Sequence, residues 1–239
     1  MTTTPEPTAG SDGFSFIALG VGDAFSALHY SSALLCECDG FRLLVDCPHP
    51  IRKILREATG GSTDIQHIDA IALTHLHPDH ASGAELFGYY LQYVLKARRP
   101  LLLHTAVHEL ARQPPLQLER YFDLAAGDDD QPLVAGPFTL RFRRNRHLVP
   151  TGALRIAAGG RTLGHSSDTP FDPELIEWLA SADLILHECG TSSVHTPYAQ
   201  LAALPPALRA RLRLFHLEDS FDRASSAIPA LEPARRYRV

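Results

Sequence analysis

The sequence lacks a hydrophobic run long enough to cross a membrane, and it has little excess charge of either sign. Its apolar stretches all fall well short of the roughly 18 residues that a spanning helix needs. Acidic side chains outnumber basic ones by 27 to 22, so the chain offers no bulk positive field for binding nucleic acid non-specifically. We therefore expect neither a membrane protein nor a stable complex with nucleic acid.

Cysteine is also scarce, and none of the 4 cysteines belongs to a CxxC pair. Cys36 and Cys38 lie two apart in an apolar run, so on a strand they share a face and do not easily bridge. We expect buried, reduced thiols rather than disulfides or a thiolate metal site. The N-terminal stretch has neither the basic region nor the apolar core of an export signal, which predicts a cytoplasmic location.

What is present fits one folded domain. A chain of 239 residues with 45% hydrophobic residues can bury a core without help from disulfides or metals. We expect a disordered N-terminal tail over residues 1–12, a single domain over residues 13–225 and a basic, weakly patterned C-terminal extension over residues 226–239.

Strand and helix signals alternate along this domain. The apolar runs Ser31–Cys38 and Phe41–Cys47 are joined by Asp-Gly, the strongest short-range hairpin signal. The continuous apolar run Ile68–Thr74 predicts a buried strand, and helical spacing predicts a helix over Gly83–Ala97. Hairpins followed by alternating helices and strands favour an α/β (α+β) fold with mixed sheets covered by helices.

Later segments give weaker signals. Leu124–Pro132, with one glycine and three aspartates, predicts a solvated loop. Ala153–Ala158 and Arg161–His165 predict a second hairpin around Gly-Gly. Leu214–Leu217 is the last strand that the pattern supports.

Side chains that bind metals are densest directly after the predicted buried strand. His75, His77, Asp79 and His80 fall within six residues. His75 and His77 lie two apart, so an extended segment points them the same way. Pro78 then bends the chain, which lets Asp79 and His80 aim at a second position. Because neutral imidazole suits Zn, Fe or Mn and a carboxylate adds charge, the cluster predicts a metal site.

This motif resembles the HxHxDH signature of the metallo-β-lactamase superfamily. The resemblance implies a four-layer αββα sandwich of two mixed sheets covered by helices. It also implies two divalent transition-metal ions, zinc first, with manganese or iron as alternatives. His147, Asp168 and His216 stand in the order of that family's three remaining ligands. Carried over, one ion takes His75, His77 and His147, the other takes Asp79, His80 and His216, and Asp168 bridges them.

Five shorter matches resemble the ribonuclease Z-like branch of this superfamily. They are Leu19–Ser26, His147–Arg155, Ser166–Thr169 with Ser167 in place of glycine, Leu186–Cys189 and His195-Thr196. The branch implies phosphodiester cleavage by a metal-bridging hydroxide, with Asp79, His195 and Glu188 as catalytic residues. His195 protonates the leaving alkoxide, and Glu188 orients or charges its imidazole. Asp46 resembles the family's D-x-G aspartate, with Pro48 replacing glycine, and is expected to support a ligand or its loop.

The substrate is expected to be small. Positions 148–167 leave room for one hairpin and not for the arm with which ribonuclease Z holds transfer RNA. A cyclic nucleotide, a 2′,3′-cyclic phosphate or a dinucleotide fits better. The arginines Arg141, Arg143, Arg144 and Arg146 face either a substrate phosphate or solvent.

Two alternative functions stay open, and so does the oligomer. The same fold and metal spacing permit a lactone or thioester hydrolase, and a non-catalytic, metal-dependent ligand-binding protein would keep the same residues. Relatives with this opening loop are commonly homodimers, so the resemblance implies a homodimer here.

Overall fold

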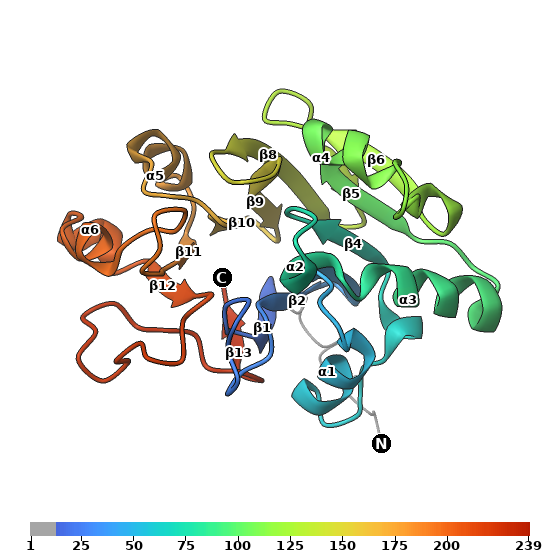
Figure 1. The fold of residues 1–239 in the computed structure, drawn as a ribbon, viewed down its shortest axis with the longest axis horizontal. Helices are drawn as coiled ribbons and strands as arrows, with labels where there is room; N and C mark the ends of the chain where they lie inside the picture. Colours follow the sequence, from blue (N-terminus) through green and yellow to red (C-terminus); the bar gives the residue numbers. More distant parts are fainter. Residues whose placement is uncertain (1–12) are drawn as a thin grey trace, which may run out of the picture.

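The computed structural model describes residues 13–239 as two β-sheets packed face to face, with helices on both outer sides (Figure 1). In that range the first sheet has strand order β13-β1-β2-β3-β4-β5-β6 and the second has β12-β11-β10-β9-β8-β7. The predicted αββα sandwich is thus confirmed. The tail predicted at residues 1–12 lies outside the described residues.

The first sheet starts with the predicted hairpin. Strands β2 and β3 pair antiparallel across Asp39-Gly40, whose positive φ angles of 50° and 78° suit a tight hairpin turn. From β3 to β6 the pairing is parallel, so the carboxyl ends of these strands meet at one edge of the sheet. The strands are β1 (Ser15–Gly20), β2 (Ala33–Cys38), β3 (Phe41–Val45), β4 (Ala70–Leu73), β5 (Pro100–His104), β6 (Asp123–Gly127) and β13 (Arg236–Arg238).

The second sheet contains the other predicted hairpin, β9 with β10, between His147 and Asp168. Strands β10, β11 and β12 run parallel, so their carboxyl ends also meet at one edge. The strands are β7 (Leu133–Ala135), β8 (Phe138–Asn145), β9 (Thr151–Ala158), β10 (Arg161–His165), β11 (Leu184–Glu188) and β12 (Leu212–Phe215).

Three apolar clusters hold the layers together. The central cluster lies between the sheets, where Phe16 and Leu43 of the first pack with Phe142 of the second. Each outer cluster joins a sheet to its helices. Figure 1 shows α3 on the outer side of one sheet and α5 on the outer side of the other. The helical segments are α1 (Ile51–Ala58), η1 (Ile65–His67), α2 (Pro78–Ala81), α3 (Ala84–Tyr89), η2 (Tyr90–Leu95), α4 (Thr105–Ala111), η3 (Leu118–Arg120), α5 (Pro173–Leu179), α6 (Tyr198–Ala202) and α7 (Pro206–Arg209). Among the described residues, none of these helices has the length and apolar character needed to traverse a bilayer.

Three strands were not predicted: β6, β7 and β13. Strand β7 pairs antiparallel with β8. Leu124–Pro132 is not all loop, because β6 pairs in parallel with β5 along its whole length. Its Asp, Ala and Gly residues have low strand propensity, so backbone pairing rather than composition makes this strand. In the C-terminal segment, β13 pairs antiparallel with β1, and Tyr237 stacks on Phe16. This short strand carries two arginines and depends on its partner.

The aspartate run and the cysteines complete the comparison with the sequence. Asp129 is not simply solvated, since its carboxylate accepts hydrogen bonds from Arg155 at 2.8 Å and from Trp178 at 2.9 Å. The 4 cysteines are buried and free, as predicted. Cys36 and Cys38 both face the central cluster.

Candidate functional site

The loop that follows β4 is held from behind by Asp46. The buried Asp46 carboxylate accepts hydrogen bonds from the Thr74 amide at 2.8 Å and from the Thr74 hydroxyl at 3.0 Å. The same hydroxyl lies 3.0 Å from Nδ1 of His75. This relay holds a proton on Nδ1 and leaves the lone pair of Nε2 pointing away from the loop. Asp46 thus contacts His75 only through Thr74.

Asp46 holds His80 directly. Nδ1 of His80 donates to the Asp46 carboxylate at 2.8 Å, so its Nε2 is the nitrogen left to face the second cluster. Asp46 itself has φ of +61°, a backbone conformation that costs a non-glycine residue about 1–2 kcal/mol. Asp46 thus has one contact toward each half of the motif, through Thr74 to His75 and directly to His80.

The first cluster of possible metal ligands brings together three imidazoles and a carboxylate. Nδ1 of His77 lies 3.1 Å from Nε2 of His75 and 3.2 Å from Nε2 of His147. An Asp168 oxygen lies 3.8 Å from the first of these Nε2 atoms and 3.6 Å from the second. One atom from each residue can therefore face a common point.

The second cluster shares Asp168 with the first. Nε2 of His80 lies 3.2 Å from an Asp79 oxygen and 3.4 Å from the other Asp168 oxygen. Nε2 of His216 lies 3.2 Å from Asp79 and 3.6 Å from Asp168. All seven residues that the motif and the resemblance single out as ligands thus come together in two groups, with one carboxylate common to both.

These distances fit a pair of four-coordinate ions. Zn–N and Zn–O bonds of about 2.0–2.2 Å place the ligand atoms of a tetrahedral site about 3.3–3.6 Å apart. The separations within each cluster lie around that range. Buried Nε2 of His80 and Oδ1 of Asp168 also lack hydrogen-bond partners, although both point toward the second cluster. Polar atoms buried in this way need a partner, and an ion supplies one.

The two clusters hold their histidines in different protonation environments. Burial lowers the pKa of His147 to about 4 and lowers that of His75 as well, which favours the neutral imidazole that binds metal. Burial also acts on His80, but the charges of Asp168 and Asp46 outweigh it and raise its pKa. A cation at the second cluster therefore competes with a proton on His80.

His195 and Glu188 form a pair beside the second cluster. Nδ1 of His195 donates to both carboxylate oxygens of buried Glu188, at 3.0 Å each. Burial alone would lower the pKa of His195, but its hydrogen bond and ion pair with Glu188 outweigh burial and raise it. The His195 ring lies 5.2 Å from that of His216 and 5.8 Å from that of His147, centroid to centroid. Its remaining nitrogen, Nε2, is free to serve the cavity that His195 lines.

Several supporting residues were not predicted. Thr74 has the contacts described above, and Asn145 donates through its amide to the carbonyl oxygens of Ser166 and Asp168. Glu218 accepts hydrogen bonds from Thr191 in the loop that carries His195. The only sequence signal for these residues is that they lie next to ligands or end a strand, which is too general to single them out.

A cavity of about 480 Å³ opens onto both clusters, a size typical of small-molecule sites. Its walls combine ligands, polar groups and apolar side chains: Asp23, Ala24, Phe25, His77, Pro78, Asp79, His147, Leu148, Asp168, Ser192, Val194, His195 and His216. The four arginines that precede His147 are not among these residues. Arg141 donates to the Asp129 carbonyl, and Arg143 pairs with Glu174, so these two serve the fold.

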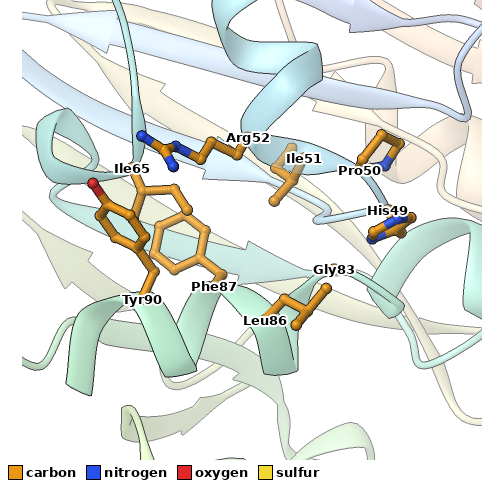
Figure 2. A pocket seen from close by; sticks show the side chains of 9 residues that line it. All are labelled: His49, Pro50, Ile51, Arg52, Ile65, Gly83, Leu86, Phe87 and Tyr90. Carbon is orange, nitrogen blue, oxygen red and sulfur yellow. The ribbon is translucent and has the colours of Figure 1, made fainter. Parts of the chain in front are cut away.

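A smaller cavity of about 190 Å³ lies between α1 and α3 (Figure 2). Its walls are mostly apolar, with Phe87 and Ile65 side by side in the view. Arg52 is held there by Asp64 and stacks over Tyr90 at 4.8 Å. None of the proposed ligands lines it, so the chemistry belongs to the larger cavity.

Comparisons with known proteins agree with this geometry. The sequence family described as anti-Pycsar protein Apyc1 matches residues 14–236. A protein of that description from Paenibacillus xerothermodurans is 29% identical over 223 residues, covering 85% of this chain and 88% of its own. The cGMP-dependent 3′,5′-cGMP phosphodiesterase A of Dictyostelium discoideum is 28% identical over 174 residues, 64% of this chain but 20% of that longer protein.

Solved structures share the fold. The metallo-β-lactamase fold protein YhfI from Bacillus subtilis superposes with a TM-score of 0.75 at 25% identity, covering 88% of this chain and 89% of its own. The short form of human tRNase Z superposes with a TM-score of 0.71 at 18% identity, covering 93% of this chain and 98% of its own. The metallo-β-lactamase fold implied by the motifs is therefore confirmed.

Proposed function

The chain belongs to the anti-Pycsar protein Apyc1 family of metallo-hydrolases, and we propose that it hydrolyses the phosphodiester of a cyclic nucleotide. The observation that carries this proposal is the Glu188–His195 pair beside two clusters of ligands that share Asp168. The clusters provide a place for a charged phosphoryl group, and the pair provides a proton where a leaving oxygen needs one.

Each ligand has a role in this proposal. His75, His77 and His147 would hold one ion, Asp79, His80 and His216 would hold the other, and Asp168 would be shared by both. Three imidazole nitrogens or a mixed set with carboxylate suit zinc, with manganese or iron as alternatives. When bound, two such ions supply Lewis acidity and lower the pKa of water toward neutrality.

The chain's own residues then complete the hydrolysis. The oxygen of water forms a bond to phosphorus as one ester P–O bond of the ring breaks, and the proton that the water loses replaces the one that His195 gives up. The departing sugar oxygen carries the bonding electron pair and takes a proton from Nε2 of His195. Glu188, bonded to Nδ1, orients the imidazole and stabilises its charged form. The product is a nucleoside monophosphate.

A small substrate is supported by what surrounds the cavity. The β9–β10 hairpin fills positions 148–167, so no long arm projects there to hold a transfer RNA. The net charge of −5 gives no long-range attraction for a polyanion. A cavity of about 480 Å³ has the size for a mononucleotide.

The proposed location and oligomeric state of the enzyme rest on its cysteines and on the family resemblance. Four buried free thiols suit the reducing cytoplasm. The opening loop and the helix arrangement support a homodimer by resemblance. No stable partner other than the substrate and a second copy of the chain is needed for the chemistry.

A panel of substrates tests the function against its alternatives. Purified protein would be assayed with 3′,5′-cyclic nucleotides, a 2′,3′-cyclic nucleotide, a lactone and a thioester, each with zinc, with manganese and with a chelator. We expect metal-dependent turnover of cyclic nucleotides above that of the lactone and thioester. Turnover of the lactone or thioester alone would replace the proposal, and binding without turnover of any substrate would leave the binding-protein alternative.

A further inference from the structure

We infer that the rim of the large cavity holds the nucleobase of the substrate, with Phe25 as the stacking surface and Leu148 as a second apolar contact. The inference rests on the proposed function and adds a base-binding subsite to it. It begins from a contrast within the cavity. The ligands form a polar, buried floor, whereas Ala24, Phe25, Leu148 and Val194 line the same cavity with apolar side chains.

Two of these side chains are unusually exposed for their type. Phe25 is 91% exposed and Leu148 is 71% exposed. A single exposed apolar residue is ordinary on a protein surface, but both of these line a cavity that leads to the ligand clusters. Leu148 directly follows the proposed ligand His147, so its backbone position is tied to the metal centre.

The loop that carries Phe25 is built to hold its place. The Asp219 carboxylate accepts hydrogen bonds from the Ser26 hydroxyl and from the Ala27 amide, the latter at 2.7 Å. The Phe25 amide donates to Asp23 at 3.1 Å. Asp219 comes three residues after the proposed ligand His216, so one short segment carries a ligand and also fixes the aromatic rim. The backbone at Phe25 is therefore held by hydrogen bonds at the residue itself and at the two residues that follow it.

The chemistry of a cyclic nucleotide matches this division. Its phosphate belongs at the charged floor, and its base is a flat ring with apolar faces and polar edges. Stacking of a base on an aromatic side chain contributes about 1–3 kcal/mol and tolerates all bases, because every base has a π-face. The Asp23 carboxylate and the Ser192 hydroxyl also line the cavity and offer polar groups to a base edge. We therefore expect the subsite to accept several bases and to favour purines for their larger overlap.

Competitive inhibitors isolate the base from the phosphate. AMP, CMP and ribose 5-phosphate would be measured as inhibitors of bis-p-nitrophenyl phosphate hydrolysis by wild type, Phe25→Ala, Leu148→Ala and Val134→Ala. Val134 is the matched control, since it is 70% exposed but does not line the cavity. We expect AMP to bind wild type more tightly than CMP and much more tightly than ribose 5-phosphate.

The variants then give the decisive result. Phe25→Ala is expected to raise the inhibition constant of AMP by about 5- to 150-fold, the range that 1–3 kcal/mol gives. The inhibition constant of ribose 5-phosphate should not change. Leu148→Ala is expected to do the same to a smaller extent, and Val134→Ala to change nothing. An equal loss for AMP and ribose 5-phosphate, or no loss for either, would overturn the inference. So would a lower molar mass of Phe25→Ala in light scattering, which would make the rim an interface between copies.

Asp219 provides an independent check as a positioning residue. Asp219→Ala should raise the KM for cyclic nucleotides in the direction of Phe25→Ala with kcat little changed, because the loop is loosened and the metal ligands stay. A fall in kcat with KM constant would contradict this role. If the protein cleaved no cyclic nucleotide at all, the proposed function would fail, but the inhibitor comparison would still report whether a base binds at the rim.

Discussion

The two sheets contribute to the proposed metal centre in different ways. The first sheet provides four of the proposed ligands from one short segment after β4, and Asp46 and Thr74 hold this segment through a few local hydrogen bonds. The second sheet provides the other three, His147, Asp168 and His216, from the ends of three separate strands. Its ligand positions depend on the register of the whole sheet, and Asp168 joins them to the first segment. One half of the proposed centre is therefore positioned by local hydrogen bonds, and the other half by the fold.

The largest expected effect comes from the residue that joins the halves. Asp168→Ala should remove most of the second ion. The rate of hydrolysis should fall by more than about 10²–10³-fold, which is the loss typical of removing one electrostatic group. Without the shared carboxylate, two like charges face each other with little compensation. Elemental analysis and steady-state rates would measure both losses, with Asp130→Ala on the exposed loop as control. Full retention of metal by Asp168→Ala would mean that the two halves bind independently.

The next effect separates proton transfer from metal binding. His195→Ala should slow substrates that release an alkoxide by about 10²–10⁴-fold while leaving the metal content intact. Release of p-nitrophenolate needs less help, so its loss should be much smaller. Glu188→Gln should resemble His195→Ala in milder form.

His187, a buried histidine next to Glu188 at the end of β11, is the control for this change. His187→Ala should alter stability rather than the dependence on leaving group, because the His187 ring bonds only the Glu188 carbonyl. Equal slowing of both substrates in His195→Ala, or loss of metal, would make His195 a ligand or a structural residue.

A smaller effect sharpens the local half of the comparison. Asp46→Asn should weaken binding of the ion held by His80 by about 10–100-fold, since it disturbs the direct hydrogen bond to that ligand. Thr74→Val should act instead on the ion held by His75, because the Thr74 hydroxyl contacts both the Asp46 carboxylate and Nδ1 of that ring. Metal titrations against a competing chelator would distinguish the two sites. The same loss at both sites in both variants would show that the loop acts as one unit.

The smallest effect concerns backbone strain in the second sheet. Ser167 precedes Asp168 with φ of +53°, and its buried hydroxyl lacks a hydrogen-bond partner. Ser167→Gly should raise stability by up to about 1 kcal/mol, because relief of left-handed strain exceeds the entropy that glycine loses. Thermal unfolding would then shift upward by about 2–4 °C. Gly160→Ala is the reverse control, because Gly160 has φ of +75° and open space around it. This change introduces left-handed strain and should lower the melting temperature.

The same division explains how much the sequence could predict. The cluster from His75 to His80 follows from the residues alone, because its ligands are adjacent and a buried strand aims them. His147 and His216 are single histidines at strand ends, and only their order in a family pattern marks them. The strands β6, β7 and β13 were missed because pairing with a neighbour stabilises them. Thr74 and Asp219 could not be predicted, because each makes its hydrogen bonds to residues distant in sequence. Thr74 bonds Asp46, and Asp219 bonds Ser26 and Ala27.

The central claim is that seven side chains hold two ions around Asp168, and a count of metal per chain tests it most directly. Freshly purified protein, and protein reconstituted with zinc or manganese and then desalted, would be analysed for metal and for protein concentration. We predict about two transition-metal ions per chain in wild type and clearly fewer in Asp168→Ala. Consistent recovery of less than one ion per wild-type chain, even after reconstitution, would contradict the binuclear centre and the hydrolysis derived from it.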